Sequence, residues 1–201
     1  MNRLVTFGCS HTEGVELDNP KKECWPAQLA STLKIPLVNH GLGGASNRLI
    51  QYSVVGFEFN KDDIVIILWT YPDRYHFFNN EEVFSDYIRI NIWTDNEINK
   101  FWFKNLSSDN NENFSNRTIV NQVNLFLQNK GILTYNLIVK PELNYYFDIT
   151  DCNIIDLNFE SDFLEKYPKA NDGWHMGKKG HLELSRAIHR VIINKNIKQT
   201  I

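Results

Sequence analysis

The stretch Leu4-Val5-Thr6-Phe7-Gly8-Cys9-Ser10-His11-Thr12-Glu13-Gly14 joins a short apolar run to a polar loop that is bounded by two glycines. The run at residues 4–7 is apolar and β-prone, so it predicts a buried strand that ends at Gly8. The loop places a hydroxyl group, that of Ser10, directly after this strand. A serine nucleophile needs such a sharp turn, but a serine in a turn is far more often structural, so this stretch alone assigns no chemistry.

Outward from this stretch, strands and helices alternate along the chain. Residues 64–68 are five consecutive aliphatic residues, which is typical of a parallel strand covered on both faces. Further strands are expected at residues 36–38 and 132–139, with a short one at 152–156. Helices with one apolar face are expected at residues 25–33, 46–57 (with Ser46 as its cap), 119–127 and 184–192. The alternation predicts right-handed crossovers and a mostly parallel sheet with helices on both faces.

Residues 71–116 interrupt this regular pattern. The segment is aromatic and rich in asparagine, and it has no sustained hydrophobic period. It is too long for an ordinary connection in a compact domain, so we interpret it as an insertion with some structure of its own, around residues 87–94. The rest of the chain contains no repeat or linker, and at 201 residues we expect one domain over residues 1–201.

The overall charge and the cysteines limit the partners and the compartment that we expect for this protein. The net charge is -3 and basic residues do not cluster, which argues against nucleic acid or an anionic membrane surface as a partner. The apolar run near the N-terminus is too short for a secretion signal, and no segment approaches the ~20 apolar residues of a membrane span. Three widely spaced cysteines, Cys9, Cys24 and Cys152, fit a reducing compartment. These features predict a cytoplasmic protein.

The loop before the last helix contains a second group of unusual residues. Its sequence is Asn171-Asp172-Gly173-Trp174-His175-Met176-Gly177-Lys178-Lys179-Gly180-His181. A catalytic serine is activated by a histidine whose other ring nitrogen is held by a carboxylate. Asp172 lies three residues before His175, close enough to hold it within a single turn. Alternatively, Asp172 and Gly173 only form a turn, and this loop alone does not decide between the two.

Together these loops resemble three sequence blocks of the SGNH, or GDSL-type, hydrolases. The family's first block, Gly-Asp-Ser-x-Thr-x-Gly, is matched by residues 8–14 at every position except Cys9. Its second block, Asn-x-Gly-x-x-Gly-x-Thr or Ser, is matched by Asn39, Gly41, Gly44 and Ser46. Its last block, Asp-Gly-x-His followed by Gly-His, is matched by Asp172, Gly173, His175, Gly180 and His181. Three blocks in the family's order are hard to obtain by chance.

The resemblance implies an α/β fold, a three-layer α/β/α sandwich with a mostly parallel, flavodoxin-like central sheet. It implies that Ser10 attacks an acyl carbonyl, that His175 takes the serine proton, and that Asp172 orients His175. The backbone N–H groups of Ser10 and Gly44 would bind the oxyanion. The resemblance implies no cofactor, and the spacing of the histidines lacks the His-Glu-x-x-His pattern, so we expect no metal.

The sequence departs from the family at the third block. The family places Gly-x-Asn-Asp after the third strand, and its asparagine gives the third oxyanion donor. Here the strand continues into Trp69-Thr70-Tyr71-Pro72-Asp73-Arg74, which has no asparagine. Thr70 could donate from about the same place, and Asn47 or Arg74 could turn inward. Arg74 could instead recognise an acidic substrate in the pocket, although a surface ion pair near Asp73 is the simpler explanation.

Two further residues of the first block need an interpretation. Cys9 replaces the family's aspartate, and we interpret it as a small buried apolar side chain; a reactive thiolate would need a lowered pKa. His11 is a loop residue that could line the substrate pocket.

The leading hypothesis is a serine esterase or acyl hydrolase that cleaves a small ester through an acyl-enzyme intermediate. The substrate would be a small-molecule or carbohydrate ester, with an O-acetylated sugar as plausible as a thioester or lipid. The alternative is a catalytically weakened binding or assembly module on the same fold, which the altered third block favours. The presence of Ser10, Asp172 and His175 together favours the enzyme, since a binding module does not need all three.

Overall fold

The computed structural model describes residues 2–78, 87–139 and 152–198 of the chain. Its centre is a five-stranded sheet in the order β2-β1-β3-β6-β7, and every neighbouring pair of these strands is parallel. The strands are β1 (Leu4–Gly8), β2 (Leu37–Gly41), β3 (Ile64–Trp69), β6 (Leu133–Ile138) and β7 (Asn153–Ile154). The predicted parallel sheet is therefore confirmed.

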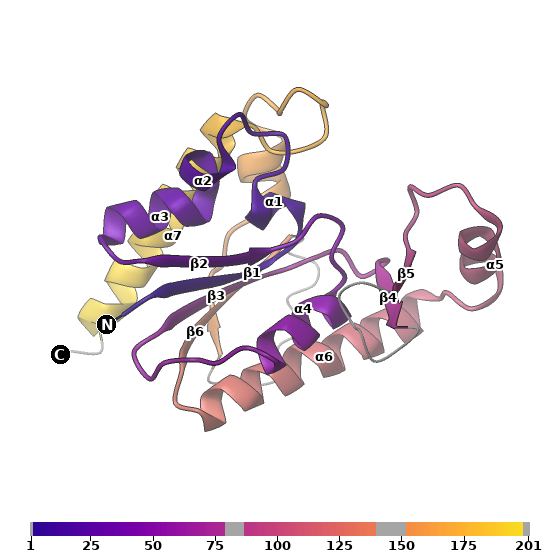
Figure 1. Ribbon diagram of the computed structural model, residues 1–201, viewed down its shortest axis with the longest axis horizontal. Coiled ribbons are helices and arrows are strands. Elements are labelled where there is room, and N and C mark those ends of the chain that lie inside the picture. Colours follow the sequence, from indigo (N-terminus) through magenta and orange to yellow (C-terminus); the bar gives the residue numbers. More distant parts are fainter. Residues whose placement is uncertain (1, 79–86, 140–151, 199–201) are drawn as a thin grey trace.

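Helices cover both faces of the sheet (Figure 1). On one face α3 packs against α7, and on the other α4 packs against α6. These helices are α3 (Trp25–Leu33), α4 (Asn47–Val55), α6 (Asp109–Asn129) and α7 (Lys178–Lys198). The arrangement confirms the α/β/α three-layer sandwich expected from the resemblance.

The two faces of the sheet contribute to two separate apolar clusters. Along β3, Ile66 and Leu68 pack into the cluster beneath α3 and α7, while Ile67 and Trp69 pack into the cluster beneath α4 and α6. All four side chains are fully buried. Successive side chains of a strand point to opposite faces, so a strand with helices on both sides must be apolar throughout. Burying each such side chain contributes roughly 1.5–3 kcal/mol.

Several local predictions are confirmed at the level of single residues. Ser46 caps α4, because its Oγ accepts a hydrogen bond from the N–H of Leu49 at 3.2 Å. Pro26 lies in the first turn of α3, where its missing N–H costs nothing. The second strand extends further than predicted, through the polar residues Asn39 and His40, because its backbone pairs with β1 up to Gly41.

In the segment predicted as an insertion, the described residues form two strands and a helix before α6. Strands β4 (Tyr75–Phe78) and β5 (Tyr87–Ile90) form an antiparallel pair, and α5 (Glu97–Asn105) follows them. In Figure 1 these elements project from the sandwich beyond the carboxyl ends of the strands. The next helix, α6, begins at Asp109, within the segment of about 71–116 that we interpreted as an insertion, and Ser108 caps it by accepting from the N–H of Asn111. The first turns of α6 are polar and partly exposed, so they show no apolar period in the sequence.

The strands begin in line, so their carboxyl ends fall at one edge of the sheet. Leu4 lies opposite Leu37 on one side and Ile64 on the other. Two four-residue helices that the sequence did not predict, α1 (Ser10–Glu13) and α2 (Pro20–Glu23), follow β1 near this edge. None of the described helices combines the length and the apolar character needed to cross a membrane.

Candidate active site

Ser10 is the first residue of α1, immediately beyond the carboxyl end of β1. The residue is 6 % exposed, and its Oγ forms no hydrogen bond with any described residue. Cys9, which precedes it, is fully buried in the cluster beneath α4 and α6, which confirms its interpretation as a small apolar side chain. The turn therefore fixes the backbone of Ser10 and leaves its hydroxyl without a partner.

Asn39 and Glu13 fasten the loop after β2 to the Ser10 helix. The amide of Asn39 donates to the carbonyl of Thr12 at 2.9 Å and accepts from the Thr6 hydroxyl at 2.9 Å. The carboxylate of Glu13 accepts from the N–H of Gly43 at 2.6 Å. These bonds join the first sequence block, which contains Ser10, to the second, which contains Gly44, so we expect the two loops to move as one unit. Glu13 was not predicted for this role, because its position in the first block carries no residue preference.

Asp172 and His175 form the hydrogen-bonded pair that the sequence predicted. The Oδ2 atom of Asp172 pairs with Nδ1 of His175, while Oδ1 accepts from the N–H groups of Trp174 at 2.9 Å and His175 at 3.0 Å. Burial raises the pKa of the Asp172 carboxyl, but these N–H groups and the His175 ring outweigh burial and lower the pKa to about 2. The carboxylate is thus ionised near neutral pH and holds Nδ1 of the ring.

The Asp172–His175 pair meets the Ser10 loop through His11. The rings of His11 and His175 lie with their centroids 5.5 Å apart, and His11 directly follows Ser10. No hydrogen bond within 3.5 Å joins Ser10 to His175 in the described part of the chain. Catalytic hydrogen bonds are often long in proteins without substrate and tighten only when substrate binds. The structure brings the two loops together and leaves the serine–histidine bond itself a prediction.

His11 is buried beside both loops. Its ring packs edge-on against Phe159 at 5.1 Å. Burial, followed by the nearby His175, His181 and Arg74, lowers the pKa of His11 to about 3, so its ring is neutral near pH 7. At 5 % exposed it lies beneath the site surface, so it can shape the pocket floor while adding no charge.

Two backbone N–H groups are available where the oxyanion is expected. Across the described segments, neither the N–H of Ser10 nor that of Gly44 donates to any acceptor. The first N–H groups of a helix have no partner within it, which accounts for Ser10. Gly44 has a φ of +72°, a left-handed conformation that glycine adopts without strain. Unpaired donors of this kind are what binding a tetrahedral oxyanion requires.

Of the three side chains predicted as possible third donors, Asn47 and Thr70 are not available to a substrate in this conformation. Asn47 donates to the carbonyl of Thr70 at 3.2 Å and to Oδ1 of Asn116 at 2.8 Å, and it accepts from the N–H of Thr70 at 2.8 Å. Asn47 therefore ties the end of β3 to α4 and has no N–H left for a substrate. The hydroxyl of Thr70 has no partner but is fully buried, so in this conformation a substrate does not reach it.

Arg89 of β5 lies over Gly44 and was not predicted from the sequence. A Cβ added to Gly44 would be 2.8 Å from Nη1 of Arg89. The hairpin that carries Arg89 is anchored near this position, because Nδ1 of His76, its partner across the strands, lies 2.9 Å from the Oγ of Ser46. Burial, then Arg89 and Arg74, lowers the pKa of His76 to about 4, so this anchor is neutral near pH 7.

Arg74 does not form the surface ion pair that was its simpler explanation. It is 8 % exposed, and its guanidinium lies over the rings of Tyr71 at 4.9 Å and Trp93 at 4.6 Å. Its Nε and Nη1 atoms are buried without a hydrogen-bond partner. The structure therefore places on the insertion side of the site a buried cation that no described residue pairs with.

His181 completes the last sequence block in a structural role. Its Nδ1 accepts from the N–H of Trp25 at 3.1 Å, which links the start of α7 to the start of α3. Burial, followed by the charge of His175, lowers the pKa of His181 to about 3, so the ring stays neutral and able to accept this bond. In the described segments, no cluster of three or more histidine, cysteine or acidic residues could hold a metal ion.

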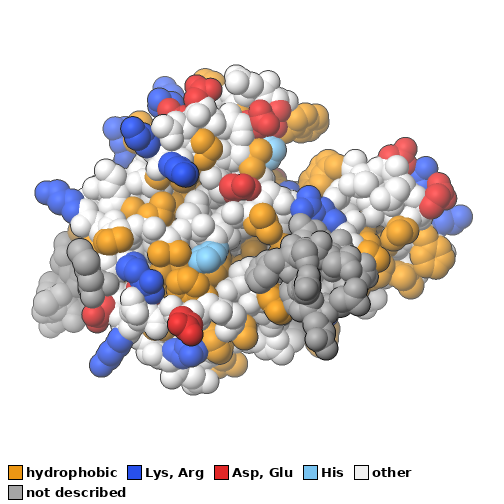
Figure 2. All heavy atoms as spheres, in the orientation of Figure 1, with side chains coloured by type: hydrophobic (Ala, Val, Ile, Leu, Met, Phe, Trp, Pro, Cys, Tyr) orange, Lys and Arg blue, Asp and Glu red, His pale blue; other side chains and the backbone are white. Residues whose placement is uncertain are grey.

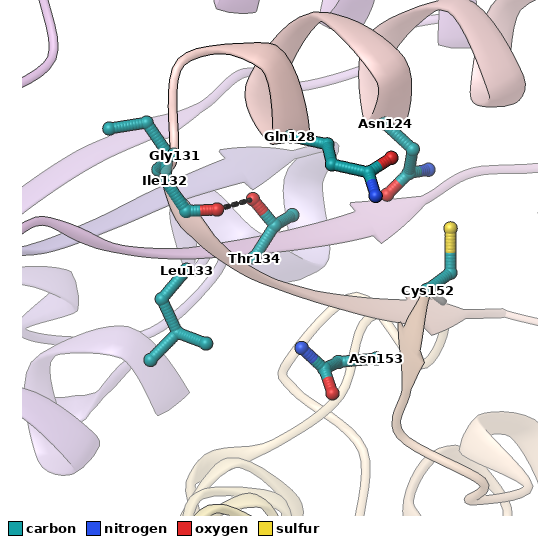
Figure 3. Close-up of a pocket in the computed structure, with 8 residues that line it drawn as sticks. All are labelled: Asn124, Gln128, Gly131, Ile132, Leu133, Thr134, Cys152 and Asn153. Carbon is teal, nitrogen blue, oxygen red and sulfur yellow. Dashed lines mark hydrogen bonds between the residues drawn. The ribbon is translucent and has the colours of Figure 1, made fainter.

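The surface is hollowed beyond the carboxyl ends of the strands. In Figure 2 the outline of the molecule is notched between the part formed by the short helices and the loop before α7 and the part formed by α5. A separate pocket of about 310 Å³ lies at the opposite edge of the sheet, where β6 begins beneath α6 (Figure 3). That pocket contains none of the candidate site residues. It is lined by Asn124, Gln128, Gly131, Ile132, Leu133, Thr134, Cys152 and Asn153.

No protein-family model matches the chain, and no curated protein matches its sequence. Several solved structures nevertheless match it along nearly its whole length. The esterase EstA from Pseudoalteromonas sp. is 14% identical with a TM-score of 0.61, over 96% of this chain and 98% of that one. A catalytic mutant of Axe2, an acetylxylan esterase from Geobacillus stearothermophilus, is 14% identical with a TM-score of 0.61, over 94% and 93%.

A member of the lipolytic protein G-D-S-L family from Veillonella parvula is 12% identical with a TM-score of 0.53, over 96% of this chain and 97% of that one. At such identities the likeness establishes the fold and leaves the activity to be argued from the site. The chain therefore has the fold of the SGNH, or GDSL-type, hydrolases.

Proposed function

We propose that this protein is a serine esterase that hydrolyses a small ester through Ser10, His175 and Asp172. The observation that carries the proposal is the Asp172–His175 hydrogen bond, on a loop whose histidine packs 5.5 Å from the ring of His11, beside Ser10. With Nδ1 held by the carboxylate, Nε2 is the ring nitrogen left to accept the serine proton. A binding module would gain nothing from holding the ring in one tautomer.

The reaction follows from these roles in two steps. The Oγ of Ser10 attacks the ester carbonyl as Nε2 of His175 takes its proton, and His175 then passes that proton to the departing alcohol. In the second step, water attacks the acyl-enzyme as Nε2 of His175 takes its proton. The acid is released and the proton returns to Ser10. Asp172 stays ionised throughout and stabilises the protonated ring. The N–H groups of Ser10 and Gly44 stabilise the oxyanion in both steps.

Arg89 is our candidate for the third oxyanion donor, in place of the family's asparagine. Its guanidinium lies against Gly44, whose N–H is one of the two unpaired donors. A cation that stabilises the oxyanion acts on the transition state more than on the bound substrate.

The substrate we consider first is an O-acetyl group on a carbohydrate. A neighbour in fold is described as an acetylxylan esterase. The insertion also exposes two large aromatic side chains, Trp93 at 57% and Phe101 at 60%, and flat aromatic surfaces can pack against sugar rings. Release of acetate from acetylated oligosaccharides, compared with release of longer acids from lipid and thioester substrates, would decide between these classes.

Labelling with a fluorophosphonate probe tests the proposal directly. We expect the wild-type protein to be labelled at neutral pH on the peptide that contains Ser10, and the Ser10→Ala variant to remain unlabelled. The Ser31→Ala variant, which changes an exposed serine of α3, is the matched control and should be labelled like the wild type. If the wild type is not labelled, the esterase proposal fails and the binding or assembly module becomes the better explanation.

The Arg89→Met variant tests the third donor. We expect kcat for ester hydrolysis to fall by about 10²-fold, the usual cost of one oxyanion donor, with KM changed much less. Kinetics on one ester, alongside the Arg190→Met variant, which removes an exposed arginine from α7, would measure this. A change in KM alone would assign Arg89 to substrate binding and reject it as an oxyanion donor.

A further inference from the structure

The guanidinium of Arg74 is buried, and none of the described acids lies close enough to be its counter-ion. Only 8 % of the residue is exposed, and among the described residues it forms neither an ion pair nor a hydrogen bond. Burying a charged group away from water costs several kcal/mol unless a partner offsets that cost.

Two aromatic rings offset part of this cost and fix the position of the cation. The guanidinium carbon lies 4.9 Å from the ring centre of Tyr71 and 4.6 Å from that of Trp93. Such contacts contribute about 0.5–2 kcal/mol each, less than an ion pair with full hydrogen bonding in a buried site. Tyr71 is itself held in place, because its hydroxyl donates to Oε1 of Glu160 at 3.1 Å. The rings therefore hold the cation rigidly and leave its hydrogen-bonding capacity unused.

Packing contacts link the cation to the loop of the proposed nucleophile, because Tyr71 beneath it bonds to Glu160, and the preceding residue, Phe159, packs at 5.1 Å against the ring of His11. The charge of Arg74 contributes to the lowered pKa of His11, the neighbour of Ser10, and Arg89 adds a second positive charge at Gly44. The acids nearby are already engaged: Glu13 with Gly43, Asp172 with His175, and Glu160 with Tyr71. Of the guanidinium nitrogens, Nε and Nη1 are buried, so Nη2 is the one through which a ligand makes contact.

We propose that the ester cleaved at Ser10 carries a carboxylate group close to the ester bond, and that Arg74 binds this carboxylate. The inference rests on the proposed esterase function and narrows its substrate to esters that carry an acid, so that an O-acetylated carbohydrate would have to be a sugar acid. A carboxylate is a monoanion, so it neutralises one guanidinium without leaving excess charge, and one of its oxygens can accept a charged hydrogen bond from Nη2. Neutral esters would leave Arg74 buried and unpaired in the complex, and the site would bind them less tightly.

Matched pairs of esters test the preference. One pair has the carboxylate on the alcohol half, 4-acetoxybenzoate against 4-acetoxybenzamide. The other has it on the acyl half, the 4-nitrophenyl monoesters of glutaric acid against those of glutaramic acid. For at least one pair we expect kcat/KM to favour the carboxylate by about ten-fold or more, mainly through KM, since one charged hydrogen bond gives at least that factor.

Variants of Arg74 test whether this residue causes the preference for esters that carry a carboxylate. In Arg74→Met, whose side chain can occupy the slot between the rings, the ratio of kcat/KM values should fall to about one. In Arg74→Lys part of the preference should remain, because the charge is kept. The Arg190→Met control should retain the wild-type ratio. If the wild type hydrolyses both members of each pair equally well, or if Arg74→Met retains the preference, the carboxylate inference is wrong while the esterase proposal stands.

A binding measurement keeps the inference testable without turnover. In the Ser10→Ala protein, we expect 4-hydroxybenzoate or glutarate to bind at least about ten-fold more tightly than the corresponding amides, measured by calorimetry and by tryptophan fluorescence, which Trp93 should report. Adding Arg74→Met should abolish this difference. Carboxylate binding without hydrolysis or fluorophosphonate labelling would support the Arg74 site and reject the esterase. No difference between acids and amides in binding would reject the Arg74 site.

Discussion

Replacing Asp172 with asparagine is expected to lower kcat for ester hydrolysis by about 10³–10⁴-fold. The asparagine oxygen can still accept from the N–H groups of Trp174 and His175, as Oδ1 of Asp172 does. Its NH₂ group then faces Nδ1 of His175 and donates to it, so the ring proton moves to Nε2. A ring protonated at Nε2 cannot take the proton of Ser10. The loop keeps its shape, so the loss of kcat comes from the wrong tautomer of His175 and not from a change in structure.

Steady-state kinetics on one activated ester measure the effect, with thermal unfolding showing that the variant is folded. Asp162→Asn is the matched control, because it makes the same change at an exposed acid of the π-helical turn Glu160–Leu164. We expect KM of Asp172→Asn to stay within about three-fold of wild type, since the interaction matters mainly in the transition state. Retention of kcat within ten-fold would remove Asp172 from the proposed triad.

Much of this site could be predicted because it depends on local rules. A serine after a short apolar strand, two glycines after the next strand, and an acid three residues before a histidine are each visible in the sequence. Parallel strands place their carboxyl ends at one edge, so loops far apart in the chain converge there. The structure shows this alignment: Leu4 lies opposite Leu37 and Ile64, so β1, β2 and β3 begin at the same level.

The rest depends on contacts between distant segments that no local pattern encodes. Asn47 has the right chemistry for an oxyanion donor, but its amide is taken up by Thr70 and Asn116, and Asn116 comes from α6. Arg89 reaches Gly44 only because the β4–β5 hairpin folds back onto the start of α4. Arg74 had an unremarkable sequence context, and its burial between Tyr71 and Trp93 follows from the packing of the insertion. The two arginines to which we assign roles in substrate binding and catalysis therefore lie in the segment where the sequence periodicity was poorest.

Gly41→Ala is expected to lower the free energy of unfolding by about 2–4 kcal/mol, the upper range for overpacking a close contact. An added Cβ would lie 2.2 Å from the backbone nitrogen of Glu13 and 2.5 Å from the carbonyl carbon of Thr12. Both atoms belong to the backbone of α1, so no side-chain rotation relieves the clash. Either β2 or the helix that carries Ser10 must move. Chemical denaturation measures the change in stability, and hydrolysis by the fraction that remains folded measures displacement of Ser10.

The Gly43→Ala variant is the control. It shows whether Gly41→Ala destabilises the protein through its close contact with α1 or because this loop tolerates no added side chain. The Cβ added at Gly43 would meet only the end of the Glu13 side chain, at 3.2 Å, and the Val15 methyl at 3.8 Å. A flexible side chain can yield by a few tenths of an ångström, so we expect a loss of stability below about 1 kcal/mol. Equal losses in the two variants would mean that α1 does not rest directly on β2. A large loss in Gly41→Ala alone would show that this glycine is required because the end of β2 touches the backbone of the helix that carries Ser10 at that point.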